Sequence, residues 1–360
     1  MNRRSFLWSI GSISLASLLS GCESQYDLQV SLLQNSIPIQ LIASLQKESK
    51  RLGIVNFQPQ LTIDDIYKLL ITWQEKKENN SSPHDLVTLG DFWLKDAIAK
   101  KLIEPLELSN LSHWDSIPPR FQNLMKRDRE GKLNPNGQLW GAPYRWGYTM
   151  IAYRKDKFEA LGWQPQDWDD LWRSQIQHRI SLLNQPREII GLILKKLGHS
   201  YNTPNINAIP EIRSQLASLH QQVKFYDSIN YLQPLILGDT WLAVGWSTDI
   251  LPIVETHRDI EAIIPRSGTS LWTDIWVKPK REKNEQDKLK KILDLINFCW
   301  ETKSAKQINL FTNGISPLEL KGKSNPKIPK MSPEILAKSD FIEPLSTEDL
   351  QQYNNLLLQI

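Results

Sequence analysis

The sequence predicts an α/β protein with two lobes. Strand-like and helix-like segments alternate between residues 28 and 89, which is the pattern of a parallel sheet covered by helices. A second alternating set follows a long β-prone stretch at residues 140–153. The chain has 360 residues, and such a length is enough for two hydrophobic cores.

The first α/β set begins at residue 28. Its expected elements, by period and by flanking Gly, Pro and polar residues, are strands at 28–33, 55–59 and 85–89 and helices at 37–52 and 63–77. Sheets of this kind place ligands at the carboxyl ends of their strands. The segment after the third strand, with Asp91, Phe92 and Trp93, is therefore a candidate binding loop.

The second set follows the stretch at residues 140–153. Its expected elements are strands at 180–183 and 242–246, helices at 186–197 and 210–220, and an extended run at 262–277. Two further helices precede a Pro-, Lys- and Ser-rich stretch at 321–329. The order is thus one α/β set, an extended stretch, a second α/β set, a second extended stretch and closing helices.

The first 21 residues have the layout of an export signal. Arg3 and Arg4 precede an apolar run at residues 6–19, which is too short and too Ser-rich to span a membrane. The run LSGC that ends at Cys22 resembles the bacterial lipobox, in which the Cys is acylated. We therefore expect a signal peptide at 1–21 and a lipid on Cys22 that holds the protein at the periplasmic face of the cytoplasmic membrane.

The segment NRRSFL at residues 2–7 resembles a twin-arginine export signal. The alternative is an ordinary basic region that contains two arginines. Cys299 is the only other cysteine, so a lipid on Cys22 leaves no partner for an intrachain disulfide. We expect Cys299, in the apolar run LINFCW, to be a small buried hydrophobe.

Composition and motifs argue against several functions. The chain has 43 basic and 40 acidic residues with no basic run, so nothing indicates nucleic-acid binding. No Gly-x-Ser-x-Gly or His-Glu-x-x-His motif occurs, and the six His residues are scattered. We therefore expect no enzyme activity, no metal and no cofactor.

Several short motifs occur in a recognisable order. They are APYRWG at 142–147, WDDLW at 168–172, RE at 187–188, LG at 197–198, NT at 202–203, LAVGW at 242–246, SLWTD at 270–274 and NGISP at 313–317. Their order and spacing resemble the spermidine/putrescine-binding periplasmic proteins, which are the ligand-capture subunits of polyamine ABC importers. The resemblance covers about residues 28–317.

This resemblance implies the type II periplasmic-binding-protein fold. In that fold two α/β lobes are joined by two crossover strands, and the lobes close by hinge motion around a ligand in the cleft between them. The expected boundaries are 22–141 for the first part of lobe 1, 142–265 for lobe 2, and 266–360 for the second part of lobe 1 with the C-terminal helices.

The resemblance also places binding residues. A polyamine carries ammonium groups on a flexible methylene chain, so its site needs aromatic faces and carboxylates. Trp246 and Trp272 match two cleft tryptophans of the family. Asp274 matches the carboxylate that pairs with an internal amine, and Glu188 matches one that binds a terminal ammonium.

About half of the family's binding pattern is retained. Gln185 stands where the family pattern has Asp, and a Tyr-Tyr pair is replaced by Phe92 and Trp93, preceded by Asp91. Aromatic residues expected after the first strand are absent, and Gly314 replaces another aromatic. The length and identity of the ligand therefore stay open.

Each candidate also has a structural interpretation. Trp246 ends a buried strand and fits a core, and Trp93 also fits a structural role. Asp274 fits a hydrogen bond at the hinge. Glu188 begins a helix, where the helix dipole alone favours a carboxylate, and Asp91 fits a helix N-cap.

The sequence thus predicts a monomeric, lipid-anchored receptor that captures a small cationic solute and delivers it to ABC permease subunits. Two alternatives remain: the same fold with a different small solute, and a degenerate member that acts as a sensor or scaffold.

Overall fold

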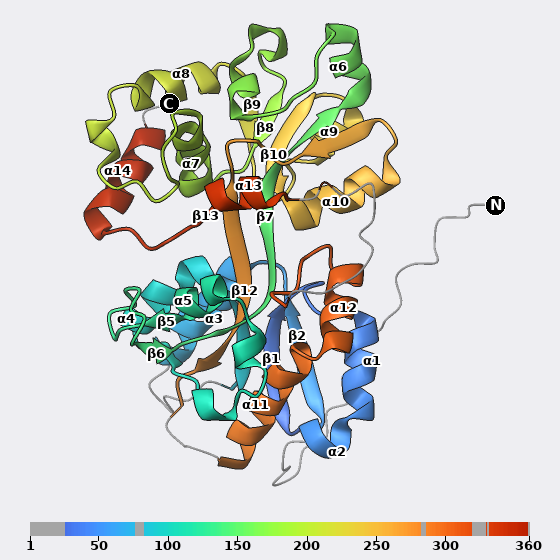
Figure 1. The fold of residues 1–360 in the computed structure, drawn as a ribbon, viewed down its shortest axis with the longest axis vertical. Helices are drawn as coiled ribbons and strands as arrows, with labels where there is room; N and C mark the ends of the chain where they lie inside the picture. The colour runs from blue at the N-terminus through green and yellow to red at the C-terminus, as the bar shows by residue number, and fades with distance from the viewer. Residues whose placement is uncertain (1–25, 76–82, 282–285, 319–328, 330, 359–360) are drawn as a thin grey trace, which may run out of the picture.

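The computed structural model describes residues 26–75, 83–281, 286–318, 329 and 331–358, and these residues form two lobes (Figure 1). Lobe 1 lies below and lobe 2 above in this view, with the long strands β7 and β12 running between them. The expected signal peptide at 1–21, Cys22 and most of the stretch at 321–329 lie outside the described residues.

Lobe 1 is built on a parallel sheet of β1 (Leu28–Leu33), β2 (Val55–Gln60) and β3 (Leu86–Gly90). β2 lies at the edge of the sheet, where Pro59 is tolerated because an edge strand has N–H positions without a partner. The surrounding helices are α1 (Ile39–Lys47), α2 (Ser49–Leu52), α3 (Ile63–Glu75), α4 (Leu94–Ala99), α5 (Pro119–Met125), α11 (Gln286–Cys299) and α12 (Thr302–Phe311).

Lobe 2 repeats the α/β design. Its strands are β8 (Ile180–Leu182), β9 (Val223–Tyr226), β10 (Leu242–Trp246) and β11 (Ile260–Ile263), and its helices are α6 (Lys155–Leu161), α7 (Pro186–Lys196), α8 (Ile212–His220), α9 (Gln233–Leu237) and α10 (Ser247–Thr256). β8 is parallel to both β9 and β10. The two strands and the helices expected here from the sequence are therefore confirmed to within a few residues.

Two long strands join the lobes. β7 (Ala142–Arg154) has 13 residues, a length of about 40 Å for an extended chain, and it runs antiparallel to β12 (Ser270–Pro279). The last part of β12 pairs with β3 of lobe 1, whereas the last part of β7 pairs with β10 of lobe 2. The central residues of both strands therefore lie between the two lobes.

The C-terminal segment differs from the expected boundaries. α13 (Pro333–Lys338), β13 (Asp340–Phe341) and α14 (Thr347–Leu357) lie on lobe 2 rather than lobe 1 (Figure 1). Tyr353 and Leu356 are buried in the lobe 2 core. The reason is an apolar face on α14 that pairs with α7, which the sequence did not reveal because a polar, Pro-rich stretch separates α14 from the earlier helices.

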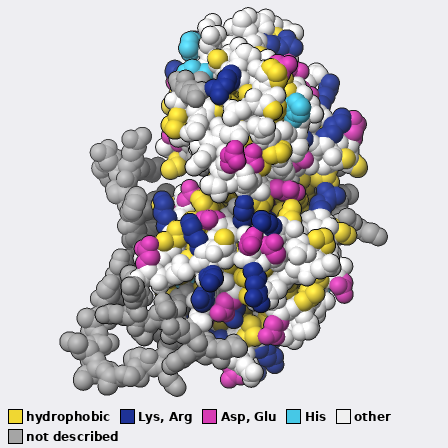
Figure 2. Space-filling model, turned by 90° about the vertical axis from the view of Figure 1, so that its left-hand side faces the viewer, with side chains coloured by type: hydrophobic (Ala, Val, Ile, Leu, Met, Phe, Trp, Pro, Cys, Tyr) yellow, Lys and Arg dark blue, Asp and Glu magenta, His cyan; other side chains and the backbone are white. Residues whose placement is uncertain are grey.

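Cys299 is buried in the core of lobe 1 with 1% of its surface exposed, as expected from its apolar neighbours, and burial raises the pKa of its thiol to about 12. Within the described parts of the chain, no helix is both long and apolar enough to cross a membrane. Basic and acidic side chains are interspersed on the face drawn in Figure 2, so this face has no single sign of charge.

Candidate ligand site between the lobes

The candidate site lies where the two sheets face each other. β3 of lobe 1 ends at Gly90, β10 of lobe 2 ends at Trp246, and α7 begins shortly after β8. These carboxyl ends point toward the middle of β7 and β12 (Figure 1), which is the edge at which open α/β sheets bind ligands. We call the residues around this point the interlobe site.

Glu188 forms the lobe 2 side of the interlobe site. It lies in the first turn of α7 and is 6% exposed. Its carboxylate accepts hydrogen bonds from Thr149 Oγ1 at 3.1 Å and from Ser270 Oγ at 2.8 Å, and it also contacts the side chain of Trp246. Burial raises the pKa of this carboxyl. Within the described chain no Lys or Arg forms an ion pair with it, so its hydrogen-bond donors are neutral, while the charge of the adjacent Arg187 opposes the rise in its pKa.

Asp249 is a second carboxylate of lobe 2, in the first turn of α10. It accepts a hydrogen bond from Tyr231 Oη at 2.9 Å, and the same Tyr231 oxygen accepts one from the backbone N–H of Trp246 at 3.2 Å. Partial desolvation raises the pKa of Asp249, whereas the charge of Arg145 opposes that rise. Asp249 was not predicted from the sequence, although its place three residues after a strand-ending Trp was a usable signal.

Asp274 and Arg145 form a buried ion pair on the crossover strands. Asp274 lies on β12 and Arg145 on β7, and their side chains are 6% and 5% exposed. Arg145 Nε and Nη2 lie 2.8 and 2.5 Å from Asp274 Oδ2. In this structure the partner of Asp274 is therefore a side chain of the protein. Arg145 belongs to the APYRWG motif at 142–147, but its pairing with Asp274 was not predicted from the sequence.

Trp272 lies two residues before Asp274 on β12 and is half-buried. A Cβ added at Gly147 would come within 2.2 Å of Trp272 Cζ2 and 2.6 Å of Ser247 Oγ. Gly147 thus leaves the space in which the indole lies against the crossover strand. Trp272 Nε1 is buried without a hydrogen-bond partner in the described part of the structure.

Asp91 links lobe 1 to the crossover strand β12 by a hydrogen bond. It follows β3 and is 2% exposed, and its Oδ1 accepts a hydrogen bond from the backbone N–H of Thr273 at 3.0 Å. Oδ2 has no hydrogen-bond partner among the described residues. Burial raises the pKa of Asp91 to about 7. The N-cap interpretation fails, because Gly90 occupies the N-cap of this short helix.

Phe92 and Trp93 lie toward lobe 1. Trp93 stacks on Tyr67 at a centroid distance of 4.1 Å, and its Nε1 donates to Asp64 Oδ1 at 3.2 Å. Phe92 contacts Trp93 edge-on and is 36% exposed. These contacts favour the structural interpretation of Trp93.

The structure therefore brings some of the predicted residues together and leaves others apart. Glu188 and Trp246 are in contact, and Trp272 and Asp274 follow each other on one strand beside Asp91. Gln185 is the N-cap of α7, is half-buried, and forms no capping hydrogen bond through its side chain. Within the described residues, no group of three or more His, Cys, Asp or Glu side chains is placed to hold a metal ion.

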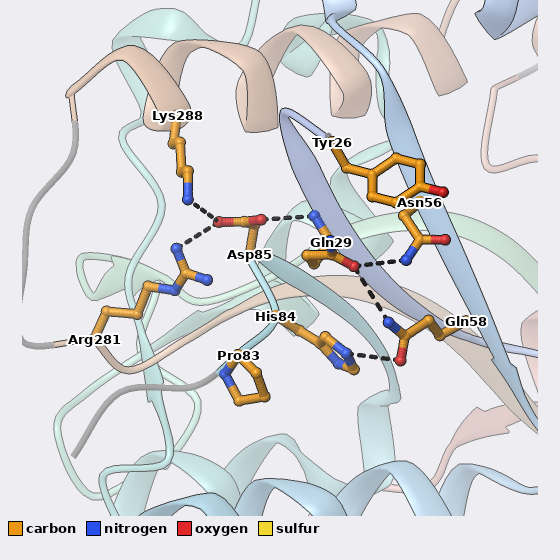
Figure 3. A pocket seen from close by; sticks show the side chains of 9 residues that line it. All are labelled: Tyr26, Gln29, Asn56, Gln58, Pro83, His84, Asp85, Arg281 and Lys288. Atoms are coloured by element: carbon orange, nitrogen blue, oxygen red, sulfur yellow. Dashed lines mark hydrogen bonds and ion pairs between the residues drawn. The ribbon is translucent and has the colours of Figure 1, made fainter. Parts of the chain in front are cut away.

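A cavity of about 440 Å³ lies elsewhere, at the amino ends of β1, β2 and β3 (Figure 3). Asp85 forms ion pairs there with Arg281 and Lys288. Gln29 accepts from Gln58, which in turn bonds the ring of His84. The cavity lies at the amino ends of these strands, whereas the interlobe site lies at their carboxyl ends.

The fold agrees with comparisons to known proteins. A model of the family described as bacterial extracellular solute-binding protein matches residues 81–344, so the chain belongs to this family. It has the type II periplasmic-binding-protein fold, with two lobes joined by the crossover strands β7 and β12. The fold class expected from the sequence is thus confirmed.

Several relatives bear the names of polyamine-binding proteins. The spermidine/putrescine-binding periplasmic protein of Escherichia coli is 25% identical over 265 residues, which cover 73% of this chain and 70% of that protein. The putrescine-binding periplasmic protein PotF of Escherichia coli is 23% identical over 253 residues, 65% of this chain and 66% of that protein. The resemblance noted in the sequence is thereby confirmed.

Solved structures of the same fold cover nearly the whole chain. The spermidine/putrescine substrate-binding protein PotD of Streptococcus pneumoniae superposes with a TM-score of 0.72 at 20% identity, covering 92% of this chain and 97% of that chain. The Tp0655 (TpPotD) lipoprotein of Treponema pallidum gives a TM-score of 0.72 at 18% identity, covering 92% and 98%.

Proposed function

We propose that this protein captures a small polyamine between its lobes and delivers it to an ABC permease. The observation that carries the proposal is Glu188, a buried carboxylate whose described hydrogen-bond donors are all neutral. A buried carboxylate is costly unless a cation pairs with it, and a ligand ammonium is a suitable cation. The printed names of the relatives support the same ligand class.

The neighbouring side chains suit a polyamine. Asp249 supplies a second carboxylate in the interlobe site, and unlike Glu188 its side chain is exposed. Trp246 and Trp272 offer indole faces, which favour cations and also pack against methylene groups. Asp91, Phe92 and Gln185 would line the lobe 1 and helix-start sides. Trp93 supports this wall through its stack on Tyr67.

The protein would bind its ligand, close its lobes and dock on permease subunits, and it would catalyse no reaction. We also propose that the chain is exported, cleaved before Cys22 and anchored as a lipid-modified monomer. The periplasmic relatives support export. Metabolic labelling with an alkyne palmitate should label the wild-type chain, and Cys22→Ser should abolish the label. The pair Arg3→Lys and Arg4→Lys should block export if the twin-arginine route is used.

Calorimetry tests the binding proposal. The chain from Ser24 onward keeps every described residue and both cores, and it should bind at least one of putrescine, spermidine and spermine. Glu130→Gln, which removes an exposed acid of lobe 1, serves as the control and should bind as the wild type does. Heat with a neutral or acidic solute and none with any amine would contradict the polyamine proposal and favour another solute in the same fold.

A further inference from the structure

Arg145 places a cation inside the interlobe site. It lies on β7 between Tyr144, which is fully buried, and Trp146. Its guanidinium carbon lies 5.7 Å from the centre of the Trp272 ring, and two of its nitrogens bond Asp274 Oδ2. A ligand amine requires a carboxylate and an indole face. Here Arg145 already occupies the carboxylate of Asp274 and one face of Trp272.

The protein is built around this arginine. A Cβ added at Gly314 would come within 2.3 Å of Arg145 Cγ and 2.4 Å of Cδ. Any larger side chain at Gly314 would occupy the space of the arginine stem. With only 4% of Arg145 exposed, the guanidinium is fixed by packing as well as by charge, because a buried arginine without its partner would be costly.

The remaining charges define how many ammonium groups fit. Within the described structure neither Glu188, which is buried, nor Asp249, which is exposed at the start of α10, forms an ion pair. Asp274 is neutralised by Arg145, and Asp91 is 2% exposed with Oδ1 bonded to the backbone N–H of Thr273. Two carboxylates are therefore left for a ligand.

We propose that Arg145 takes the place of one ligand ammonium at Asp274 and thereby makes the site selective for diamines over triamines and tetramines. This inference rests on the polyamine function proposed above and specifies its substrate class. A diamine presents two cations to Glu188 and Asp249. A third ammonium would lie near the guanidinium of Arg145, where like charges repel and no carboxylate is free.

Calorimetry with putrescine and spermidine at equal ionic strength tests the inference. The wild-type chain should bind putrescine at least 10-fold more tightly than spermidine. Arg145→Met frees Asp274, so the ratio of spermidine to putrescine affinity should rise at least 10-fold. Arg145→Lys keeps the positive charge and should retain the preference for putrescine. The double variant R145M/D274N lacks the freed carboxylate and should lose the gain for spermidine.

Circular dichroism and a melting curve show whether Arg145→Met folds. If it does not fold, a second variant tests the inference. Arg145→Gln removes the charge but keeps an N–H donor for Asp274, and it should raise the same affinity ratio. An unchanged ratio in the folded neutral variant would overturn this inference while leaving the polyamine function intact. Absence of heat with every amine in the wild-type chain would overturn both.

Discussion

Gly314 leaves the space that the side chain of Arg145 fills: a Cβ at Gly314 would lie 2.3 Å from Arg145 Cγ. The two residues are far apart in the sequence, on β7 and on the loop after α12, and the backbone of this loop pairs with β7 through Trp146 and Ile315. The resemblance noted in the sequence implies an aromatic residue at the position of Gly314, and a ring there would overlap the Arg145 stem. The small residue at position 314 and the arginine at position 145 therefore depend on each other.

This relationship predicts the effect of Gly314→Ala. The added methyl group must displace the Arg145 stem from Asp274, and such overpacking costs about 1–3 kcal/mol of unfolding free energy. Gly90→Ala is a matched control in the same region, because its Cβ would lie 3.6 Å from Ile63 Cγ2, an ordinary contact. Urea unfolding should show a loss for the first variant and less than about 1 kcal/mol of change for the second.

The Arg145–Asp274 pair predicts a non-additive mutant cycle. Arg145→Met leaves the Asp274 carboxylate buried without its partner, which costs about 3–5 kcal/mol of unfolding free energy. The double variant R145M/D274N removes both charges and should recover most of that loss, since replacing a buried pair by neutral groups is often without cost. Additive losses in the double variant would show that the two side chains do not act as a pair.

Glu188→Gln separates ligand binding from stability. The amide oxygen can still accept from one of the Thr149 and Ser270 hydroxyls, and the amide N–H can donate to the other, while the cost of a buried charge disappears. The melting temperature should therefore stay equal or rise, while putrescine affinity should fall about 10- to 100-fold, as expected for a lost charged hydrogen bond. Calorimetry and a melting curve on the same sample decide this. A drop in stability without a drop in affinity would mean that Glu188 is only structural.

Much of the fold could be predicted from the sequence because local patterns and tertiary packing agree. β10 has the expected bounds, and β1, β3 and α7 differ by one residue or less at each end. The C-terminal elements could not be predicted in the same way. α14 is fixed on lobe 2 by long-range contacts: it packs against α7, Tyr353 Oη donates to the backbone carbonyl of Thr203, and Asp349 accepts from the Asn205 N–H.

The site was harder to predict, because sequence patterns identify residue types but not partners. Asp274 matched a carboxylate that pairs with an amine. Its actual neighbour is set by the register of β7 against β12, which places Arg145 opposite Asp274. Trp93 similarly matched a ligand aromatic, whereas its stack on Tyr67 depends on how α3 packs against β3. Neither pairing has a signature within a single segment of the chain.

Asp91 predicts a pH-dependent stability difference. Burial raises its pKa from 3.8 to about 7 in the folded protein, so between these pH values the folded state holds a proton that the unfolded state has lost. The unfolding free energy contributed by this group therefore falls as pH rises from about 4 to about 7. Asp91→Asn keeps an oxygen acceptor for the Thr273 N–H but cannot ionise, so it should not show this fall.

Urea unfolding of both proteins across this pH range measures the effect. Near pH 4 the wild-type chain and Asp91→Asn should have similar stability. Near pH 8 the variant should be the more stable by on the order of 2–4 kcal/mol, the value for a shift of about 3 pKa units and thus an upper range. Glu130→Gln, at an exposed acid, should follow the wild type at every pH. If Asp91→Asn were instead less stable at pH 8, the ionised carboxylate would be stabilising the fold through Thr273 or Arg127, and the burial cost assigned to Asp91 would be wrong.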